Sequence, residues 1–204
     1  SPDYEKIITA KPDILIYYAF WSEQVKALEE KLEPMGINVV CLDCFYPQTI
    51  TEDVTKLSYI LGKKNEGEEF INWYKAYVNE IKSRTKDLET KDMPRVYLEG
   101  YNEWGTCSKG SPDDAICTIA GGINIARDLV GSTYSEYPTI DPEWAISQDP
   151  DVIVCEVSRK SASSGYNEDD VKEMAAFRDG AKNRSGLANV TAVKNDKIFL
   201  ISSD

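Results

Sequence analysis

The chain has 204 residues, enough for one large domain or for two small lobes with buried cores. Its net charge of −12 argues against a nucleic-acid partner, which would require a basic surface, and no apolar run approaches the roughly 20 residues that span a bilayer. The chain contains no histidine, which excludes Ser-His-Asp triads, Cys-His pairs, HExxH zinc sites and histidine-ligated haem. We therefore expect no catalytic residue, no cofactor and no directly bound metal ion.

The first 43 residues are predicted to alternate between helix and strand. A short helix over 3–11 ends at a Pro-Asp break, and a buried strand follows over 14–18. The next helix has Val25, Leu28, Leu32 and Met35 on one face, with Gly36 at its C-terminal cap, before a strand over 37–43. A strand, helix and strand in succession predict a parallel βαβ unit.

The middle of the chain is predicted to be helical. A helix over 51–62 precedes a longer one over 66–88, in which Phe70, Tyr74, Tyr77 and Ile81 recur at helical spacing. The longer helix would extend about 35 Å, which exceeds the crossover of a small lobe. We interpret it as a rod that links two lobes.

The second half resumes the alternation of strands and helices. The helix that opens at Asp141-Pro142-Glu143 has Asp at the N-cap, Pro at N1 and an acid in its first turn. Further strands are predicted over 96–99, 151–155 and 197–201, and further helices over 113–120 and 168–179.

An internal repeat relates the two halves. Residues 3–16 and 141–154 share Asp, Glu, Ile, Pro and Asp at five equivalent positions, offset by 138 residues, and both end in apolar strand positions. Duplication of a helix, a Pro-Asp break and a buried strand explains this pattern. The alternative is that such openings and breaks are common in αβ units.

The five cysteines are odd in number, so they cannot all pair within one chain. Cys41 and Cys44 have the spacing of a redox motif, but they follow a predicted strand, whereas a thioredoxin-type motif opens a helix. We favour inert or structural cysteines over a redox role.

Several segments together resemble the periplasmic binding proteins for cobalamin, haem and iron-siderophores. They are residues 5–16, 36–43, 61–63, 95–97, 120–126 and 150–153. The resemblance implies an α/β fold of two Rossmann-like lobes with parallel sheets, joined by one long backbone helix. It places an N-terminal lobe at 1–63, the helix at 64–90 and a C-terminal lobe at 91–204. Family members usually carry a further strand before this start and a helix after this end, so the first lobe is expected to be truncated.

The resemblance also implies a function. It predicts a monomeric, extracytoplasmic solute-binding protein of an ABC transporter, lipid-anchored in its full-length form, and not an enzyme. Such a protein binds a chelated-metal nutrient (a ferric siderophore, haem or cobalamin) between its lobes and delivers it to the permease dimer.

Glu5 and Glu143 hold equivalent positions in the repeat. In the family, one glutamate at this place on each lobe docks into arginine pockets of the permease, and complementary charges of this kind set register and association rate. The alternative is local, because an acid in the first turn of a helix favours the helix dipole without any partner.

Aromatic and basic residues follow the predicted strands, where open α/β sheets bind ligands. Large aromatic surfaces suit a flat macrocycle or chelate, and an arginine could neutralise an anionic one. The expected ligand residues are Tyr18, Trp21, Phe45, Tyr46, Tyr101, Trp104 and Arg159. The alternative for Tyr18 and Phe45 is a position in the core.

Two other functions stay open from the residues alone. An intracellular, chelatase-like α/β enzyme could use the acid pairs Asp113-Asp114 or Asp169-Asp170, although both stand at predicted helix starts, where capping explains them. A ligand-sensing ectodomain would share the same two-lobe plan.

Overall fold

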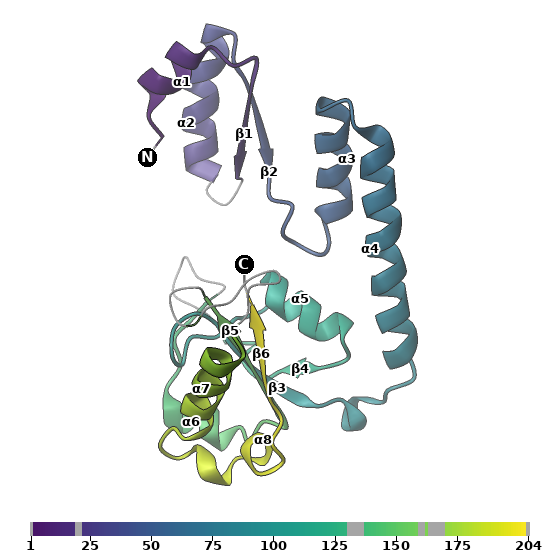
Figure 1. The fold of residues 1–204 in the computed structure, drawn as a ribbon, viewed down its shortest axis with the longest axis vertical. Helices are drawn as coiled ribbons and strands as arrows, with labels where there is room; N and C mark the ends of the chain where they lie inside the picture. Colours follow the sequence, from purple (N-terminus) through teal and green to yellow (C-terminus); the bar gives the residue numbers. More distant parts are fainter. Residues whose placement is uncertain (1, 19–21, 130–136, 159–161, 163–169, 203–204) are drawn as a thin grey trace. The chain divides into compact units, whose positions relative to one another are not determined.

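A computed structural model describes residues 2–18, 22–129, 137–158, 162 and 170–202 (Figure 1). The chain divides into two compact units, residues 1–75 and 76–204. Each unit has its own sheet and every strand pair is parallel, which confirms the predicted α/β fold with parallel sheets. The predicted borders 1–63, 64–90 and 91–204 stay a prediction.

The first unit contains the predicted βαβ arrangement. Its elements are α1 (Tyr4–Ala10), β1 (Ile14–Tyr18), α2 (Ser22–Leu32), a 3-10 turn (Glu33–Met35) and β2 (Asn38–Leu42). β1 pairs with β2 from Ile14 opposite Asn38 to Tyr18 opposite Leu42. The amphipathic face of α2 buries Leu28 and Leu32 completely beneath this sheet.

β1 is not buried on both faces, contrary to the prediction. Leu15 and Tyr17 pack toward the helices, whereas Ile14, Ile16 and Tyr18 point to the other face and are 37–44% exposed. Successive strand residues alternate between faces, and in the described first unit the small core lies on one face only.

The predicted face of α2 also ends earlier than expected. Met35, placed on that face by its spacing, is 60% exposed, because the α-helix stops at Leu32 and a 3-10 turn follows. Gly36 takes the left-handed conformation predicted for the cap, with φ of 81°.

Two helices follow, α3 (Ile50–Ile60) and α4 (Lys64–Thr85). They approach closely at Gly67, which is buried against the side chain of Ser58. α4 is one continuous helix of 22 residues, as its periodicity predicted, and the boundary between the two units falls inside it. None of the described helices is both long enough and apolar enough to cross a membrane.

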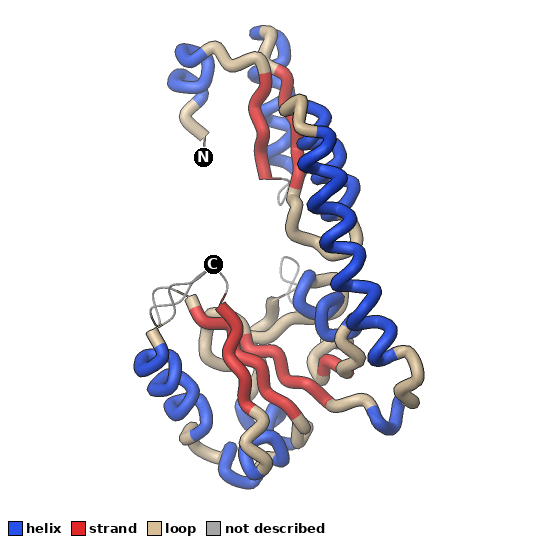
Figure 2. Tube along the Cα trace, turned by 45° about the vertical axis from the view of Figure 1, so that its right-hand side comes forward, coloured by secondary structure: helices blue, strands red, loops and turns tan. Residues whose placement is uncertain are grey.

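The second unit has a four-stranded sheet in the order β4-β3-β5-β6, whose strands run side by side in Figure 2. Its strands are β3 (Arg95–Glu99), β4 (Ile123–Asn124), β5 (Val152–Val157) and β6 (Ile198–Ser202). Its helices are α5 (Pro112–Ile119), α6 (Pro142–Ser147), α7 (Val171–Lys182) and α8 (Thr191–Lys194), with 3-10 turns at Thr90–Asp92 and Leu187–Asn189.

The core of the second unit forms where the sheet meets α6, α7 and α8. Tyr97, Ile153 and Ile198 contribute from three strands, and Val190 and Ala192 from the segment before β6. β4 and α8 were not predicted, because two and four residues are too short to display a hydrophobic period.

The repeated segments adopt the same local geometry. Asp3 caps α1 and Asp141 caps α6, each accepting backbone N–H groups through its carboxylate. Lys11 and Asp149, at equivalent positions, both take the left-handed conformation, with φ of 47° and 43°. This conformation is uncommon for residues other than glycine, so its recurrence at the same place supports the predicted duplication.

Candidate functional site

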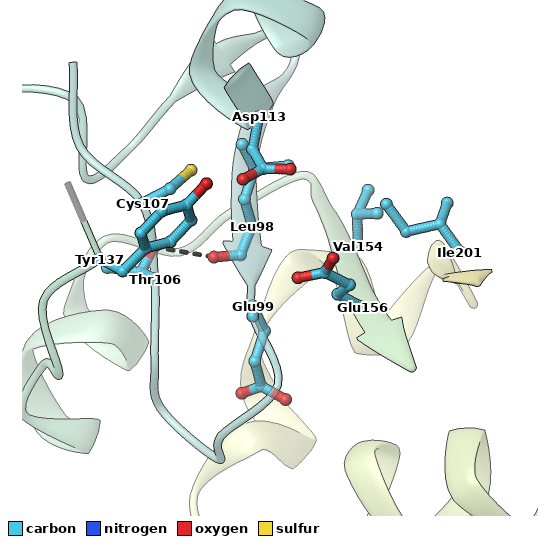
Figure 3. Close-up of a pocket in the computed structure, with 10 residues that line it drawn as sticks. Leu98, Glu99, Thr106, Cys107, Asp113, Tyr137, Val154, Glu156 and Ile201 are labelled. Atoms are coloured by element: carbon cyan, nitrogen blue, oxygen red, sulfur yellow. Dashed lines mark hydrogen bonds between the residues drawn. The ribbon is translucent and has the colours of Figure 1, made fainter. Parts of the chain in front are cut away.

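The carboxyl ends of the second unit's parallel strands meet at one edge of its sheet, where open α/β sheets bind ligands. A pocket with about 270 Å³ of empty space, part of it open to solvent, lies at this edge (Figure 3). Its lining residues are Leu98, Glu99, Gly100, Thr106, Cys107, Asp113, Tyr137, Val154, Glu156 and Ile201.

Three carboxylates line this pocket: Glu99 from the end of β3, Glu156 from β5 and Asp113 from the first turn of α5 (Figure 3). Burial raises the pKa of Glu156, the negative charge of Asp113 raises it further, and a hydrogen bond from the Tyr101 hydroxyl opposes the rise. The described lining contains no lysine or arginine. The described lining of this pocket is therefore negatively charged.

Apolar side chains complete the pocket. Leu98, Val154 and Ile201 come from three adjacent strands and provide its apolar surface. The hydroxyl of Thr106 donates to the carbonyl oxygen of Leu98 at 2.8 Å, which ties the returning loop to β3. A concave apolar surface with a few polar groups is typical of small-molecule sites.

Glu99 anchors the loop that follows β3. Its carboxylate is almost fully buried and accepts hydrogen bonds from both terminal nitrogens of Arg184, one of them at 2.8 Å. It also accepts the Tyr97 hydroxyl at 3.0 Å and the backbone N–H of Trp104 at 3.2 Å. Burial raises the pKa of Tyr97, and the charge of Glu99 adds to that rise. Sequence reasoning missed Glu99 and Arg184, since a buried carboxylate at a strand end leaves no periodic signal.

Trp104, predicted to contact ligand, packs against the core of the second unit. Its ring stacks on Tyr97 at a centroid distance of 6.4 Å, and the guanidinium of Arg184 lies 5.5 Å from its ring centroid. Its backbone φ is 61°, which Glu99 supports through the hydrogen bond to its N–H. These contacts give Trp104 a structural role, and its ligand contact stays a prediction.

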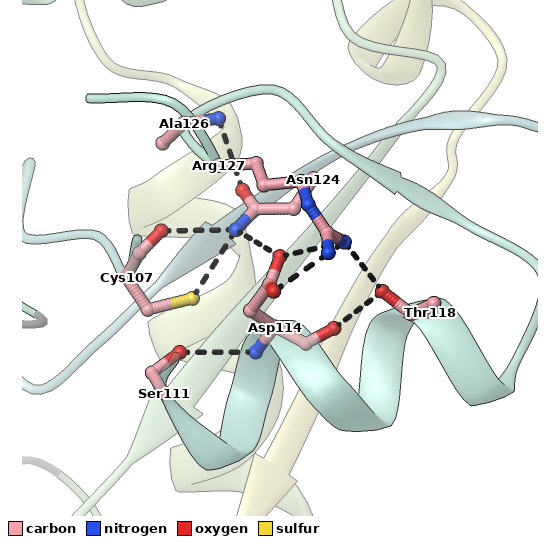
Figure 4. A network of polar contacts seen from close by, with 7 residues as sticks. All are labelled: Cys107, Ser111, Asp114, Thr118, Asn124, Ala126 and Arg127. Atoms are coloured by element: carbon pink, nitrogen blue, oxygen red, sulfur yellow. Dashed lines mark hydrogen bonds and ion pairs between the residues drawn. The ribbon is translucent and has the colours of Figure 1, made fainter. Parts of the chain in front are cut away.

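A second buried network, centred on Asn124, lies beside the pocket (Figure 4). The Asn124 amide donates to the carbonyl oxygen of Cys107 at 2.9 Å and to the carboxylate of Asp114 at 3.2 Å. Arg127 pairs with the same carboxylate at 3.4 Å. Asp114 is therefore held in a buried network, while Ser111 rather than an aspartate caps α5.

In the first unit, the predicted aromatic residues follow the two strands. Tyr18 ends β1 and is 44% exposed, and Phe45, after β2, is 52% exposed. The rings of Phe45 and Tyr46 meet edge to face at 6.1 Å, and the Asp43 carboxylate accepts the backbone N–H of Phe45 at 3.3 Å. Neither Tyr18 nor Phe45 belongs to the core of this unit, which was the alternative interpretation.

The structure places the predicted ligand residues differently in the two units. Tyr18, Phe45 and Tyr46 gather after the strands of the first unit, Tyr101 bonds to Glu156 in the second, and Trp21 and Arg159 lie outside the described residues. Asp113 and Glu156 were missed as pocket residues. A signal existed for Glu156, which interrupts an otherwise apolar strand; Asp113 was read only as a residue of a helix start.

Glu5 and Glu143 occupy matching exposed positions. Each lies in the first turn of its helix, two residues after the capping aspartate. Both positions allow contact with a partner, and both also favour the helix dipole. Their docking role stays a prediction.

The described residues offer no direct metal site. Among them, no group of three or more aspartates, glutamates or cysteines is placed to hold a metal ion. All five cysteines are thiols, and burial raises the pKa of each of them.

The family model described as "Periplasmic binding protein" matches residues 1–204. Among curated proteins, a cobalamin-binding protein of Halobacterium salinarum is 43% identical over 68 residues, which is 32% of this chain and 17% of that protein.

Solved structures with the same fold cover nearly the whole chain. The TroA-like periplasmic binding protein FepB of Veillonella parvula matches with a TM-score of 0.81 and 20% identity, over 97% of this chain and 59% of that one. The haem-binding protein HutB of Vibrio cholerae matches with a TM-score of 0.72 and 18% identity, over 99% of this chain and 72% of that one. The molybdate-binding protein MolA of Haemophilus influenzae matches with a TM-score of 0.74 and 18% identity, over 98% of this chain and 61% of that one. The chain thus spans about three fifths of FepB and MolA.

Proposed function

Because this chain belongs to the periplasmic binding protein family, we propose that it is the solute-binding component of an ABC importer, which captures a chelated-metal nutrient outside the cytoplasm and delivers it to a permease dimer. The family is one of substrate-binding proteins, which are not enzymes. This confirms the prediction that the protein is not an enzyme.

The observation that carries the proposal is the family match over the full chain together with the pocket at the strand ends of the second unit. The apolar surface of that pocket suits an organic ligand with extended apolar surfaces. A ferric siderophore, haem or cobalamin has such surfaces. The described residues lack a cluster for a bare cation.

Permease docking is proposed for Glu5 and Glu143. Their equivalent positions in a duplicated segment suit two equivalent sites on a permease dimer. We further propose that the full-length protein is a lipid-anchored monomer that brings its ligand to the membrane surface.

Ligand screening tests the proposed function. Thermal denaturation of the purified protein is measured with cyanocobalamin, haemin and ferric siderophores, and a true ligand raises the melting temperature by mass action. Failure of every chelate to shift the melting temperature, with no binding by calorimetry, would contradict the proposal.

The docking role needs a separate experiment, with the permease reconstituted in proteoliposomes. Glu5→Ala together with Glu143→Ala should abolish most ligand uptake while leaving ligand affinity unchanged. Undiminished uptake by the double variant would refute docking through these residues and leave solute binding intact.

A further inference from the structure

The pocket of the second unit carries negative charge that its described lining does not neutralise. Three lining residues are carboxylates: Glu99, Asp113 and Glu156. Glu99 is paired with Arg184 and directs its oxygens toward Tyr97 and the Trp104 backbone. Among the lining residues that the structure describes, none is a lysine or arginine, so Asp113 and Glu156 give the pocket its negative charge.

Glu156 differs from Asp113 in having no helix to stabilise. Asp113 lies in the first turn of α5, where the helix dipole accounts for an acid. Glu156 lies in the apolar strand β5, between the buried Cys155 and Val157, and its side chain is partly desolvated in the pocket. A desolvated carboxylate is stabilised by hydrogen-bond donors or by positive charge.

The described surroundings supply one such donor, the hydroxyl of Tyr101. A carboxylate can accept several hydrogen bonds at its two oxygens, and Figure 3 shows the Glu156 oxygens directed into the space beside Leu98 and Glu99. Glu156 thus has acceptor capacity facing the space that a ligand would fill.

We propose that Glu156, assisted by Asp113, makes this protein selective for a neutral or cationic metal chelate whose rim presents N–H donors, such as a carboxamide-bearing corrinoid or a cationic hydroxamate chelate. This selectivity rests on the proposed solute-binding function. Anionic chelates would place carboxylates or catecholate oxygens against Glu156 and Asp113, and like charges in a partly desolvated site repel.

The test is isothermal titration calorimetry of the purified protein with four probes. Cyanocobalamin and ferrioxamine B represent donor-bearing neutral and cationic chelates, and haemin and ferric enterobactin represent anionic ones. The variants are Glu156→Gln, which keeps the shape of the side chain, and Asp113→Asn. Asp179→Asn is the control, because it removes one exposed negative charge from the same unit.

The wild-type protein is expected to bind a donor-bearing probe most tightly. Glu156→Gln should weaken that binding about 10- to 100-fold, the range for losing a hydrogen bond to a charged group. Asp113→Asn should weaken it less, and Asp179→Asn should leave it unchanged. Unchanged melting curves would show that the two pocket variants are folded.

Two results would overturn the inference alone. The first is that the wild-type protein binds haemin or ferric enterobactin most tightly. The second is that Glu156→Gln and Asp113→Asn bind the preferred donor-bearing probe as tightly as the wild type or more tightly. In both cases solute binding would stand. Absence of binding by all four probes would instead contradict the proposed function, and the selectivity with it.

Discussion

The guanidinium of Arg184 and the carboxylate of Glu99, 85 residues apart in the sequence, form a two-pronged ion pair in the interior of the second unit. The Arg184 side chain is 16% exposed and that of Glu99 is 2% exposed. The same carboxylate holds the Trp104 backbone, so the pair fixes the loop that leads from β3 toward the pocket.

Removing Arg184 should destabilise the protein strongly. Arg184→Met leaves the Glu99 carboxylate buried without its cation, and breaking a buried pair in this way lowers the free energy of unfolding by about 3 kcal/mol. Urea denaturation followed by circular dichroism measures the change. Arg84→Met is the control, because Arg84 pairs with Glu80 on the exposed surface of α4 and should shift stability by less than about 0.5 kcal/mol. Equal changes in the free energy of unfolding for the two substitutions would show that the interior pair stabilises the protein no more than the exposed pair does.

The Asn124 network predicts a second stability change. Asn124→Ala leaves the carbonyl oxygen of Cys107 and the backbone N–H of Ala126 without their partners, which should lower the free energy of unfolding by about 2 kcal/mol. Asn79→Ala, at an exposed position of α4, should have almost no effect. If Asn124→Ala left the free energy of unfolding unchanged, this result would contradict the network shown in Figure 4.

Asn124→Asp adds a pH dependence to that prediction. It would set a second carboxylate beside Asp114, and repulsion between like charges raises the pKa of one of them in the folded protein. A raised carboxyl pKa destabilises the folded state at neutral pH and ceases to do so as pH falls below it. The difference in melting temperature from wild type should therefore shrink on acidification, and a constant difference would argue against charge repulsion.

Two helical glycines should respond oppositely to alanine. A Cβ atom at Gly67 would collide with the Ser58 side chain where α3 and α4 meet, so Gly67→Ala should destabilise by about 1–3 kcal/mol. Gly180 in α7 has open space around its missing side chain, so Gly180→Ala should stabilise by about 0.5–1 kcal/mol. Adding Ser58→Gly should rescue Gly67→Ala in thermal denaturation. If it does not, the helices do not meet at this point.

Thiol labelling tests the burial of the cysteines. Burial raises the pKa of Cys107 and Cys155 to about 12 and that of Cys117 to about 11, so these thiols remain protonated and unreactive at neutral pH. With N-ethylmaleimide and mass spectrometry, Cys41 and Cys44 should react first, because they are only half-buried. The other three should react only after denaturation, and rapid labelling of any of them would contradict their burial.

The same raised pKa values predict a loss of stability in alkali. In the unfolded chain these thiols lose their protons near their ordinary pKa of 9, whereas in the folded protein they keep them up to about pH 11 or 12. The unfolded state therefore binds fewer protons in this range, and stability falls as pH rises through it. Replacing Cys155 by alanine should reduce the slope of melting temperature against pH above about pH 9.

Elements with a long hydrophobic period could be predicted from the sequence. The continuous helix α4, the parallel pairing of β1 with β2 and the Asp141-Pro142 opening of α6 are confirmed. The exposed face of β1 was predicted to be buried, because apolar residues at every position do not reveal how many faces of a sheet are covered.

The candidate site could be predicted only in part. Strand ends were identified as its place, and Tyr101 lies there beside Glu156. The position of Trp104 in the core depends on Glu99 and Arg184, whose pairing joins segments far apart in the sequence and has no local pattern. Asp113 and Asp114 look equivalent in the sequence, yet the helical turn directs one to the pocket and the other to Asn124.

Lys11 and Asp149 share the same left-handed backbone conformation, but their side chains differ in chemistry and in contacts. In the second unit, the Asp149 carboxylate accepts hydrogen bonds from the backbone N–H and the hydroxyl of Thr191. These bonds hold the segment before β6 close to the start of β5. In the first unit, the bend carries Lys11, which lines a surface pocket. The equivalent bend thus carries hydrogen bonds to another segment in the second unit, and substitutions at Asp149 should cost more stability than substitutions at Lys11.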